Sequence, residues 1–275
     1  MRILITNDDG ISAPGLAVAE AIGAELAGPE GEVWTVAPTF EQSGVSHAIS
    51  YIRPMRLERL GERRFTIEGS PADCVLAALF EVLKDTPPDL VLSGVNRGHN
   101  VAEDTVYSGT VGGAMEAALH GVKAIALSQY FGPPGRGATD LFGAAEAHGA
   151  AVCRRLLERG DWTGPPFATF YNVNFPSVAP DAVRGMRVTF QGARAASFGV
   201  QPQVAPNGRT YLWLTHARGN ADTAPGSDSR ECHDGYVTVT PLRADLTAHD
   251  LVASLSDSLR EDDEAAGARR GGERP

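Results

Sequence analysis

The sequence predicts an α/β fold, a doubly wound and mostly parallel sheet followed by a smaller β-rich extension. First, short apolar runs alternate with helical segments through residues 1–165, as they do in repeated β-α units. Second, polar loops follow several of these runs, at the sheet edge where ligands bind in such folds. Third, after residue 167 strand-like runs are joined by Gly-, Pro- and Asn-rich stretches.

The core begins with a predicted buried strand over 2–6, an apolar run that ends in polar residues. Apolar residues at helical spacing then predict a helix over 13–26, and a second strand over 32–37 is closed by Pro38. Alternating polar and apolar residues indicate a hairpin over 51–68.

The same patterns predict the rest of the core as helices over 72–83, 110–120 and 140–159 and strands over 89–93 and 123–128, with a loop over 94–100. Pro71 suits the first turn of its helix, and Gly121 suits a C-cap. In the extension we expect long loops, a closing helix over 246–259, and strands over 168–176, 186–190, 210–216 and 235–242.

Three regions follow from this order of elements. Residues 1–165 form the expected core, and 166–259 form a β-rich extension whose closing helix suits oligomerisation. The tail over 260–275 is charged, Gly-rich and without apolar anchors, so we expect it to be disordered. A chain of 275 residues is long enough for one large α/β domain with such appendages.

Charge and composition exclude several classes of protein. The formal net charge of −10 argues against a general nucleic-acid binder, which needs a basic face. The three cysteines lie far apart, which argues against a disulfide framework or a structural zinc site. No apolar run is long enough to span a membrane, and no signal peptide precedes the first strand. We therefore expect a cytoplasmic protein with neither nucleic-acid nor membrane partners.

Two adjacent carboxylates, Asp8 and Asp9, follow the first predicted strand. They repel each other unless hydrogen bonds or a cation offset their charge. Hard divalent cations select such oxygen ligands. In the alternative interpretation, one aspartate caps the following helix while the other is solvated. The sequence of this loop alone does not decide between the two interpretations.

Two further loops follow predicted strands and should reach the same edge of the sheet. In the first, Ser43 offers a hydroxyl to a metal and Gly44 lets a phosphate approach the backbone. In the second, Asn96 offers a carbonyl oxygen to a cation and Arg97 neutralises a phosphate. Each loop on its own also suits an ordinary polar turn.

Ser108, Gly109 and Thr110 precede a predicted helix, whose N-terminal N–H groups suit an anion. A simple N-cap is compatible with that role, because capping and anion binding use the same groups. His47 and His99 lie in or beside the polar loops and are candidates for an acid or a phosphate donor. Weaker candidates for contacting a nucleobase are Phe40 and Tyr107.

Three common motifs are missing from the sequence. There is no GxGxxG after the first strand, no GxxxxGK[ST] and no GxSxG. Their absence disfavours a dinucleotide-binding fold of the usual kind, a P-loop NTPase and an α/β-hydrolase.

Six ordered stretches together resemble one family, the SurE (survival protein) nucleotidases. They extend over residues 3 to 249, and the ordered set is specific although each stretch is weak alone: ILITNDDGISAPG, VAPTFEQSGVSHAIS, GSPADCV, DLVLSGVNRGHN, YSGTVGGAMEAALHG and DGYVTVTPLRADLTAH. The family often has a charged pair after Ala-Pro, where this chain has Thr39 and Phe40. The substrate contacts of that loop and the base preference are therefore left open.

The resemblance implies a Rossmann-like N-terminal domain with a β-rich C-terminal extension. It implies phosphatase activity on nucleoside 5′- and 3′-monophosphates, with exopolyphosphatase activity in some members. It also implies one divalent cation per subunit, Mg²⁺ or Mn²⁺, bound by the residues that match Asp8, Asp9, Ser43 and Asn96. The expected assembly is a homodimer or homotetramer whose subunits exchange C-terminal segments.

The resulting hypothesis is hydrolysis of a phosphomonoester by a metal-activated water, with N–H groups at 108–110 stabilising the phosphate. Both aspartates are expected to bind the metal; Asp8 is the candidate for orienting or deprotonating that water, and the sequence leaves the choice between Asp8 and Asp9 open. An aspartyl-phosphate mechanism with Asp8 as nucleophile ranks lower, because its familiar pattern is DxD rather than two adjacent aspartates. Two hypotheses of a different class are a binding module without turnover and a purely structural stress protein.

Overall fold

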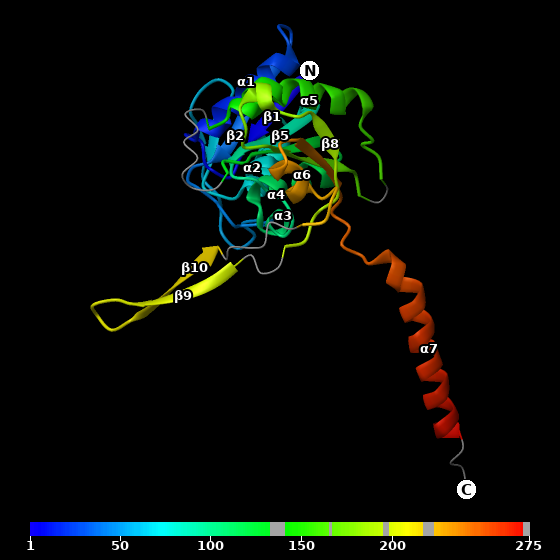
Figure 1. Cartoon of the computed structure of the whole chain (residues 1–275). Helices are drawn as coiled ribbons and strands as arrows, with labels where there is room; N and C mark the ends of the chain where they lie inside the picture. The colour runs from blue at the N-terminus through cyan, green and yellow to red at the C-terminus, as the bar shows by residue number, and fades with distance from the viewer. Residues whose placement is uncertain (133–140, 165–166, 195–197, 217–222, 272–275) are drawn as a thin grey trace. The chain divides into compact units, whose positions relative to one another are not determined.

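The computed structural model describes residues 1–132, 141–164, 167–194, 198–216 and 223–271, with only the backbone described over 261–271. It divides into two compact units, Met1–Arg243 and Ala244–Pro275. The first unit contains every strand and all but one of the described helices (Figure 1).

One nine-stranded mixed sheet forms the centre of the first unit. Its strands, in spatial order, are β3 (Leu57–Arg59), β4 (Arg64–Ile67), β2 (Glu32–Pro38), β1 (Arg2–Thr6), β5 (Leu90–Arg97), β6 (Lys123–Gln129), β7 (Phe170–Phe175), β11 (Val237–Leu242) and β8 (Met186–Val188). Neighbouring strands are parallel except for β3 with β4 and β11 with β7. The predicted doubly wound α/β fold is confirmed.

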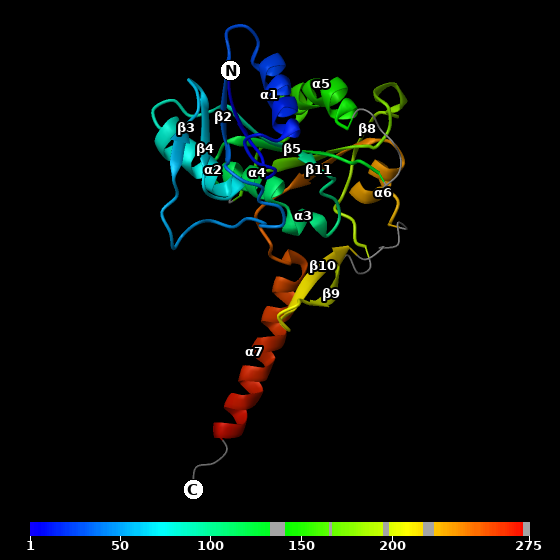
Figure 2. The ribbon, with the colours of Figure 1, turned by 90° about the vertical axis from the view of Figure 1, so that its left-hand side faces the viewer.

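Helices cover both faces of this sheet (Figure 2). The helices are α1 (Pro14–Ala27), α2 (Pro71–Ala77), which continues into a π-helical turn (Ala78–Val82), α3 (Asp104–Tyr107), α4 (Gly109–Leu119), α5 (Gly143–Arg159) and α6 (Asp228–His233), with a 3-10 turn at Pro180–Ala182. Because side chains alternate across a strand, Ile3 and Ile5 pack with α1 and α5, whereas Leu4 packs with α2 and α4. A strand covered on both faces is apolar in its centre, as the ILI of RILIT is.

The β-rich extension does not form a sheet of its own. Strands β7, β11 and β8 continue the central sheet, and only β9 (Phe198–Val204) and β10 (Thr210–His216) pair separately, as an antiparallel hairpin. The sequence predicted β10 but assigned β9 to a loop, which is wrong. Strand β9 reads FGVQPQV and lacks the apolar alternation of a buried strand, because it pairs only with β10 and its side chains are largely exposed.

Most predicted boundaries agree with the structure to within a few residues. The predicted loop over 94–100 is the main exception, because β5 resumes pairing with β6 at Asn96 after a register shift and ends at Arg97. Gly121 follows the C-cap of α4 with a φ of 75°, which fits its predicted role because glycine adopts this left-handed conformation readily.

The second unit consists of a connector and helix α7 (His249–Gly271). Its apolar side chains are exposed, among them Leu251, Val252, Leu255 and Leu259. The predicted disordered tail over 260–275 overlaps the end of this helix, and residues 272–275 lie outside the described residues. Within the described residues, no helix has both the length and the apolar character that a bilayer crossing requires.

Candidate active site

Asp8 follows β1 and is almost fully buried, with 4% of its surface exposed. Its Oδ1 accepts a hydrogen bond from the Thr110 hydroxyl at 2.6 Å. The pKa of Asp8 is raised to about 7, chiefly by burial and also by the neighbouring Asp9 carboxylate, against the opposing effect of the Thr110 bond. This carboxyl therefore exchanges its proton near neutral pH.

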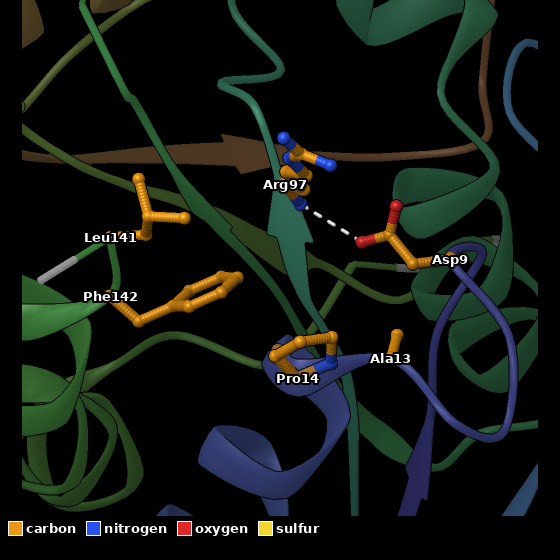
Figure 3. Close-up of a pocket in the computed structure, with 7 residues that line it drawn as sticks. Asp9, Ala13, Pro14, Arg97, Leu141 and Phe142 are labelled. Atoms are coloured by element: carbon orange, nitrogen blue, oxygen red, sulfur yellow. Dashed lines mark hydrogen bonds between the residues drawn. The ribbon is translucent and has the colours of Figure 1, made fainter.

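Asp9 is partly buried, and its Oδ2 accepts a hydrogen bond from the backbone N–H of Arg97 at 2.9 Å (Figure 3). Burial raises the pKa of Asp9, and the carboxylate of Glu41 raises it further. The Arg97 N–H and guanidinium lower it without cancelling that shift. In both carboxyls burial thus shifts the balance toward the neutral form, and a positive charge beside them opposes this shift.

The N-terminus of α4 lies against Asp8. The hydroxyl of Ser108 caps the helix by accepting from the Val111 N–H at 3.1 Å. A Cβ added to Gly109 would lie only 2.9 Å from the Asp8 Cβ, so a glycine is required for this close approach. The aspartate therefore shares its space with N–H groups that have no partner within the helix and with the positive end of the helix dipole.

The loop after β2 is joined to the same place through its backbone. The N–H of Gln42 donates to the Asp8 carbonyl at 2.7 Å. Ser43, on the exposed surface of this loop, donates its hydroxyl to Glu41 at 2.7 Å, and the described residues show no hydrogen bond from it to Asp8 or Asp9. Gly44 has a φ of 74° and open space around its Cα.

Asn96 and Arg97 end β5 beside the aspartates. The Asn96 amide nitrogen donates to the Gly98 carbonyl at 2.8 Å, a bond that orients the amide and does not involve its oxygen. Arg97 is exposed, and its guanidinium carbon lies 5.9 Å from the centre of the Phe131 ring. Hydrogen bonds thus link the predicted residues Asp8 with Thr110 and Asp9 with Arg97. Ser43 and Asn96 lie on the adjoining segments, where their side chains bond to other partners.

A pocket of about 370 Å³ opens beside Asp9 and Arg97 (Figure 3). Its other walls come from the start of α1 and from the residues just before α5, namely Ala13, Pro14, Gly15, Leu141 and Phe142. The sequence did not predict this apolar wall, because Leu141 and Phe142 match the apolar spacing of the helix that they precede. One side of the pocket is charged and the other is apolar, as a ligand with an anionic and an apolar part requires.

The model of the family described as "Survival protein SurE" matches residues 3–197 of this chain. The chain belongs to the SurE family. A protein of Cereibacter sphaeroides named "5'-nucleotidase SurE" is 62% identical over 256 residues, 93% of this chain and 98% of that protein. One of the same name from Ruegeria pomeroyi is 58% identical over 260 residues, 94% and 100% of the two chains. The crystal structure of SurE protein from Aquifex aeolicus has a TM-score of 0.77 and 33% identity, and the match covers 92% of this chain and 98% of that one.

The histidine and aromatic candidates lie in different surroundings in this SurE family member. His47 forms an ion pair with Glu116, and the Nε2 of His120 lies 2.9 Å from the other oxygen of the same carboxylate. His99 stacks on Tyr130 with ring centroids 4.4 Å apart. The two remaining candidates are largely solvent-accessible, Phe40 with 70% and Tyr107 with 48% of their surface exposed.

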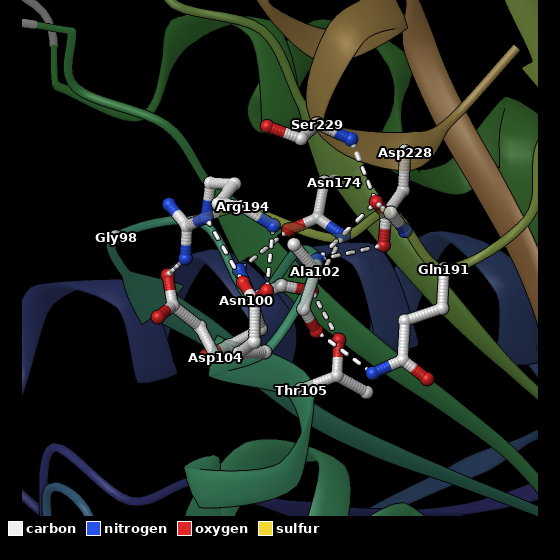
Figure 4. A network of polar contacts seen from close by, with 12 residues as sticks. Gly98, Asn100, Ala102, Asp104, Thr105, Asn174, Gln191, Arg194, Asp228 and Ser229 are labelled. Carbon is white, nitrogen blue, oxygen red and sulfur yellow. Dashed lines mark hydrogen bonds and ion pairs between the residues drawn. The ribbon is translucent and has the colours of Figure 1, made fainter. Parts of the chain in front are cut away.

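A buried polar network supports the segment that follows β5 (Figure 4). Asn100 donates its backbone N–H to the Asn174 side chain at 2.7 Å, and its carbonyl accepts from Asn172 at 2.7 Å. Arg194 forms an ion pair with Asp104 at 2.5 Å. The sequence did not reveal this network, because isolated asparagines in a strand give no local sign that they bind a distant loop.

Asp228, at the start of α6, completes this network. Its carboxylate accepts the backbone N–H groups of Ala102, Gly192 and Ser229 at 3.1, 2.8 and 2.7 Å. Burial raises the pKa of Asp228, although these three hydrogen bonds favour its charged form. The C-terminal part of the chain thereby fixes the segment that follows Asn96 and Arg97 at the end of β5.

Proposed function

We propose that this chain is a divalent-metal-dependent phosphomonoesterase that hydrolyses nucleoside 5′- and 3′-monophosphates to nucleoside and phosphate. The observation that carries the proposal is the pair of carboxyls with raised pKa values beside the N-terminus of α4. The names of the SurE relatives, 5′-nucleotidases more than half identical over nearly the whole chain, support the same activity.

One divalent cation, Mg²⁺ or Mn²⁺, would be held by oxygen atoms of Asp8, Asp9, Ser43 and Asn96. These donors suit a hard cation, whose charge would offset the repulsion between the two carboxylates. In the part of the chain that the structure describes, no cluster of three or more His, Cys, Asp or Glu side chains offers a different metal site. The hydroxyl of Ser43 can keep its bond to Glu41 and still offer a lone pair. When bound, the cation supplies charge neutralisation at the phosphate and a lowered pKa for a bound water.

The phosphate would lie against the N-terminus of α4. The start of α4 at Ser108, Gly109 and Thr110 would supply an anion site, in which the backbone N–H of Thr110 also interacts with Asp8, and Arg97 would add positive charge at its edge. Gly44 leaves the opposite loop open for the phosphate oxygens. These groups stabilise the negative charge that spreads over the phosphoryl oxygens during transfer.

Asp8 is suited to receive the proton of the attacking water. Burial raises the pKa of Asp8 above that of an ordinary aspartate, which makes its carboxylate a better proton acceptor. The water oxygen bonds to phosphorus as the bond from phosphorus to the nucleoside oxygen breaks, and the nucleoside leaves as an alcohol after taking up a proton. The apolar wall of the pocket beside Asp9 would exclude water from the nucleoside side of this reaction.

Release of inorganic phosphate from 5′-AMP and 3′-AMP tests the proposal. We expect Asp8→Asn and Asp9→Asn each to lower kcat by about 100-fold or more with excess Mn²⁺. The matched control is Asp181→Asn, because Asp181 lies on the exposed 3-10 turn far from β1 in the sequence. EDTA should abolish turnover and Mn²⁺ should restore it. Near-normal turnover in both aspartate variants would refute the site. A trapped phosphoenzyme would instead favour the mechanism in which Asp8, and not water, attacks phosphorus.

Polyphosphate and assembly extend the same proposal. A terminal phosphate of polyphosphate presents the same anionic group, so we include exopolyphosphatase activity, measured as phosphate release from polyphosphate chains.

We also propose a cytoplasmic homodimer or homotetramer with exchanged C-terminal segments. The exposed apolar side chains of α7 and of the β9–β10 hairpin support it. Light scattering after gel filtration checks this, and a monomer at micromolar concentration would contradict it.

A further inference from the structure

A second pocket, of about 490 Å³, lies at the end of α5. Its residues come from the last turn of α5 and from the start of β7 and the end of β11, where Tyr171 pairs with Pro241. Strand β7 runs parallel to β6 and, through β5, to β1, so its first residues lie at the sheet edge opposite to the one that carries Asp8. This pocket is therefore separate from the candidate active site.

Three arginines, Arg155, Arg159 and Arg243, line the pocket. Among the described residues, no Asp or Glu side chain forms an ion pair with any of them, whereas the adjacent Arg154 pairs with Glu25 at 3.0 Å. Arg155 and Arg159 are also four residues apart on one helix, an arrangement in which like charges repel. An anion between the three guanidinium groups would remove this repulsion.

The pocket holds the head group of Arg243 in place. Its Nε donates to the Thr169 hydroxyl at 3.2 Å, which leaves the two terminal nitrogens of the guanidinium for a ligand. One carboxylate, Asp161, also lines the pocket. It accepts the hydroxyl and N–H of Thr163 at 2.6 and 2.9 Å, and these bonds together with the charge of Arg243 lower its pKa. Three guanidinium groups against one carboxylate leave the lining positively charged.

The remaining wall is apolar and well supported. It consists of Leu156, Met186, Val188, Val239 and Pro241 together with the ring of Tyr171. The Tyr171 hydroxyl donates to the Asp161 carbonyl at 2.9 Å, and its ring packs edge-on against Trp162 at 4.8 Å between centroids. A volume near 490 Å³ falls in the range of small-molecule sites, which combine such walls with a few polar groups.

We propose that this pocket binds a small organic anion, a phosphate monoester or a carboxylate that carries an apolar body. The guanidinium groups of Arg155, Arg159 and Arg243 hold the anionic group in a fork geometry that suits either a phosphate or a carboxylate. The apolar wall covers the body of the ligand, which inorganic phosphate lacks. This site lies outside the proposed phosphatase reaction and does not depend on it.

Phenylphosphonate is the first probe, because its phosphorus–carbon bond is not a substrate for phosphomonoester hydrolysis. The full chain with Trp34→Phe and Trp213→Phe keeps Trp162 as its one tryptophan, next to the pocket residue Tyr171. Binding is measured in EDTA by Trp162 fluorescence and by calorimetry. We expect saturable binding that is roughly tenfold tighter than that of inorganic phosphate, since the apolar body adds buried surface.

Paired variants test the arginines. Arg159→Gln with Arg243→Gln should weaken phenylphosphonate binding roughly tenfold, the loss of a charge-assisted contact, whereas Arg154→Gln on the same helix should leave it unchanged. Circular dichroism checks that the variants fold. Tighter binding of benzoate than of phenylphosphonate would assign the site to carboxylates, and the reverse to phosphate monoesters. The proposal is overturned if neither measurement shows saturable binding, or if the Arg159 and Arg243 variant binds as well as the Arg154 variant.

Discussion

Asp8→Asn should stabilise the metal-free protein at high pH while it removes activity. The pKa of Asp8 is raised by burial from 3.8 to about 7 in the folded chain. In the unfolded chain the carboxyl ionises near its ordinary pKa, so the folded state binds the proton more tightly. Well below pH 3.8 the carboxyl is protonated in both states and does not change stability, whereas stability falls as the pH rises between the two pKa values.

The size of the effect follows from the shift. A difference of about three pKa units corresponds to about 4 kcal/mol of unfolding free energy, reached when the pH exceeds the folded pKa. Asparagine has no charge to desolvate and keeps an oxygen that can accept the Thr110 hydroxyl. The advantage of Asp8→Asn over the unchanged chain should therefore grow by about 1.4 kcal/mol per pH unit between pH 4 and 7, and then level off.

Urea unfolding at pH 5, 6, 7 and 8 in EDTA measures this difference. The same series with Mg²⁺ is the control, because a cation at the carboxylates favours their charged form and should shrink the advantage of the variant. Asp181→Asn should show no dependence of this kind, because Asp181 lies in an exposed turn. A stability difference that is flat with pH, or that falls as the pH rises, would refute the argument from burial.

Three shorter predictions concern the residues around this carboxyl. Gly109→Ala places a Cβ 2.9 Å from that of the buried aspartate and should lower kcat/KM by roughly 100-fold; unchanged kinetics would show that α4 can move aside. Thr110→Val removes a hydrogen bond that lowers the aspartate's pKa, so the acid limb of the kcat profile should shift to higher pH, and a shift to lower pH would contradict this. Glu116→Gln weakens the contacts to His47 and His120 and should cost about 1 kcal/mol in urea unfolding, with Glu146→Gln on the exposed face of α5 as the control.

The sequence predicted the central part of the site because parallel strands place their carboxyl ends at one edge. Asp8 and Asp9 after β1 and Arg97 at the end of β5 could therefore be placed together before the structure was known. Helix α4 followed from its apolar spacing and its Ser108 cap. These features depend on the local sequence pattern and on one general rule, that parallel strands end at the same edge of a sheet.

Other features depend on pairings that leave no local trace. The orientation of the Ser43 hydroxyl toward Glu41 is decided by loop conformation, not by residue type. Asp228 lies in a stretch that the sequence assigned to a loop, yet it begins helix α6 and binds the backbone of Ala102, distant in the chain. Strand β9 lacks the alternation of a buried strand, since its partner is the neighbouring strand of an exposed hairpin. Such contacts become visible only when the distant segments are brought together.

The last three strands of the sheet pair in an order that differs from their order in the chain, and this has consequences for synthesis and for shortened fragments. Strand β8 precedes β11 in the chain but pairs with it, and β11 in turn lies between β7 and β8. A nascent chain that has reached residue 236 therefore has β7 with one bare edge and β8 with no neighbour. Such non-local pairing is slow to form. The ribosome must deliver the chain as far as Leu242 before the sheet can close, so a fragment that stops near residue 165 would leave the edge of β6 open to other chains.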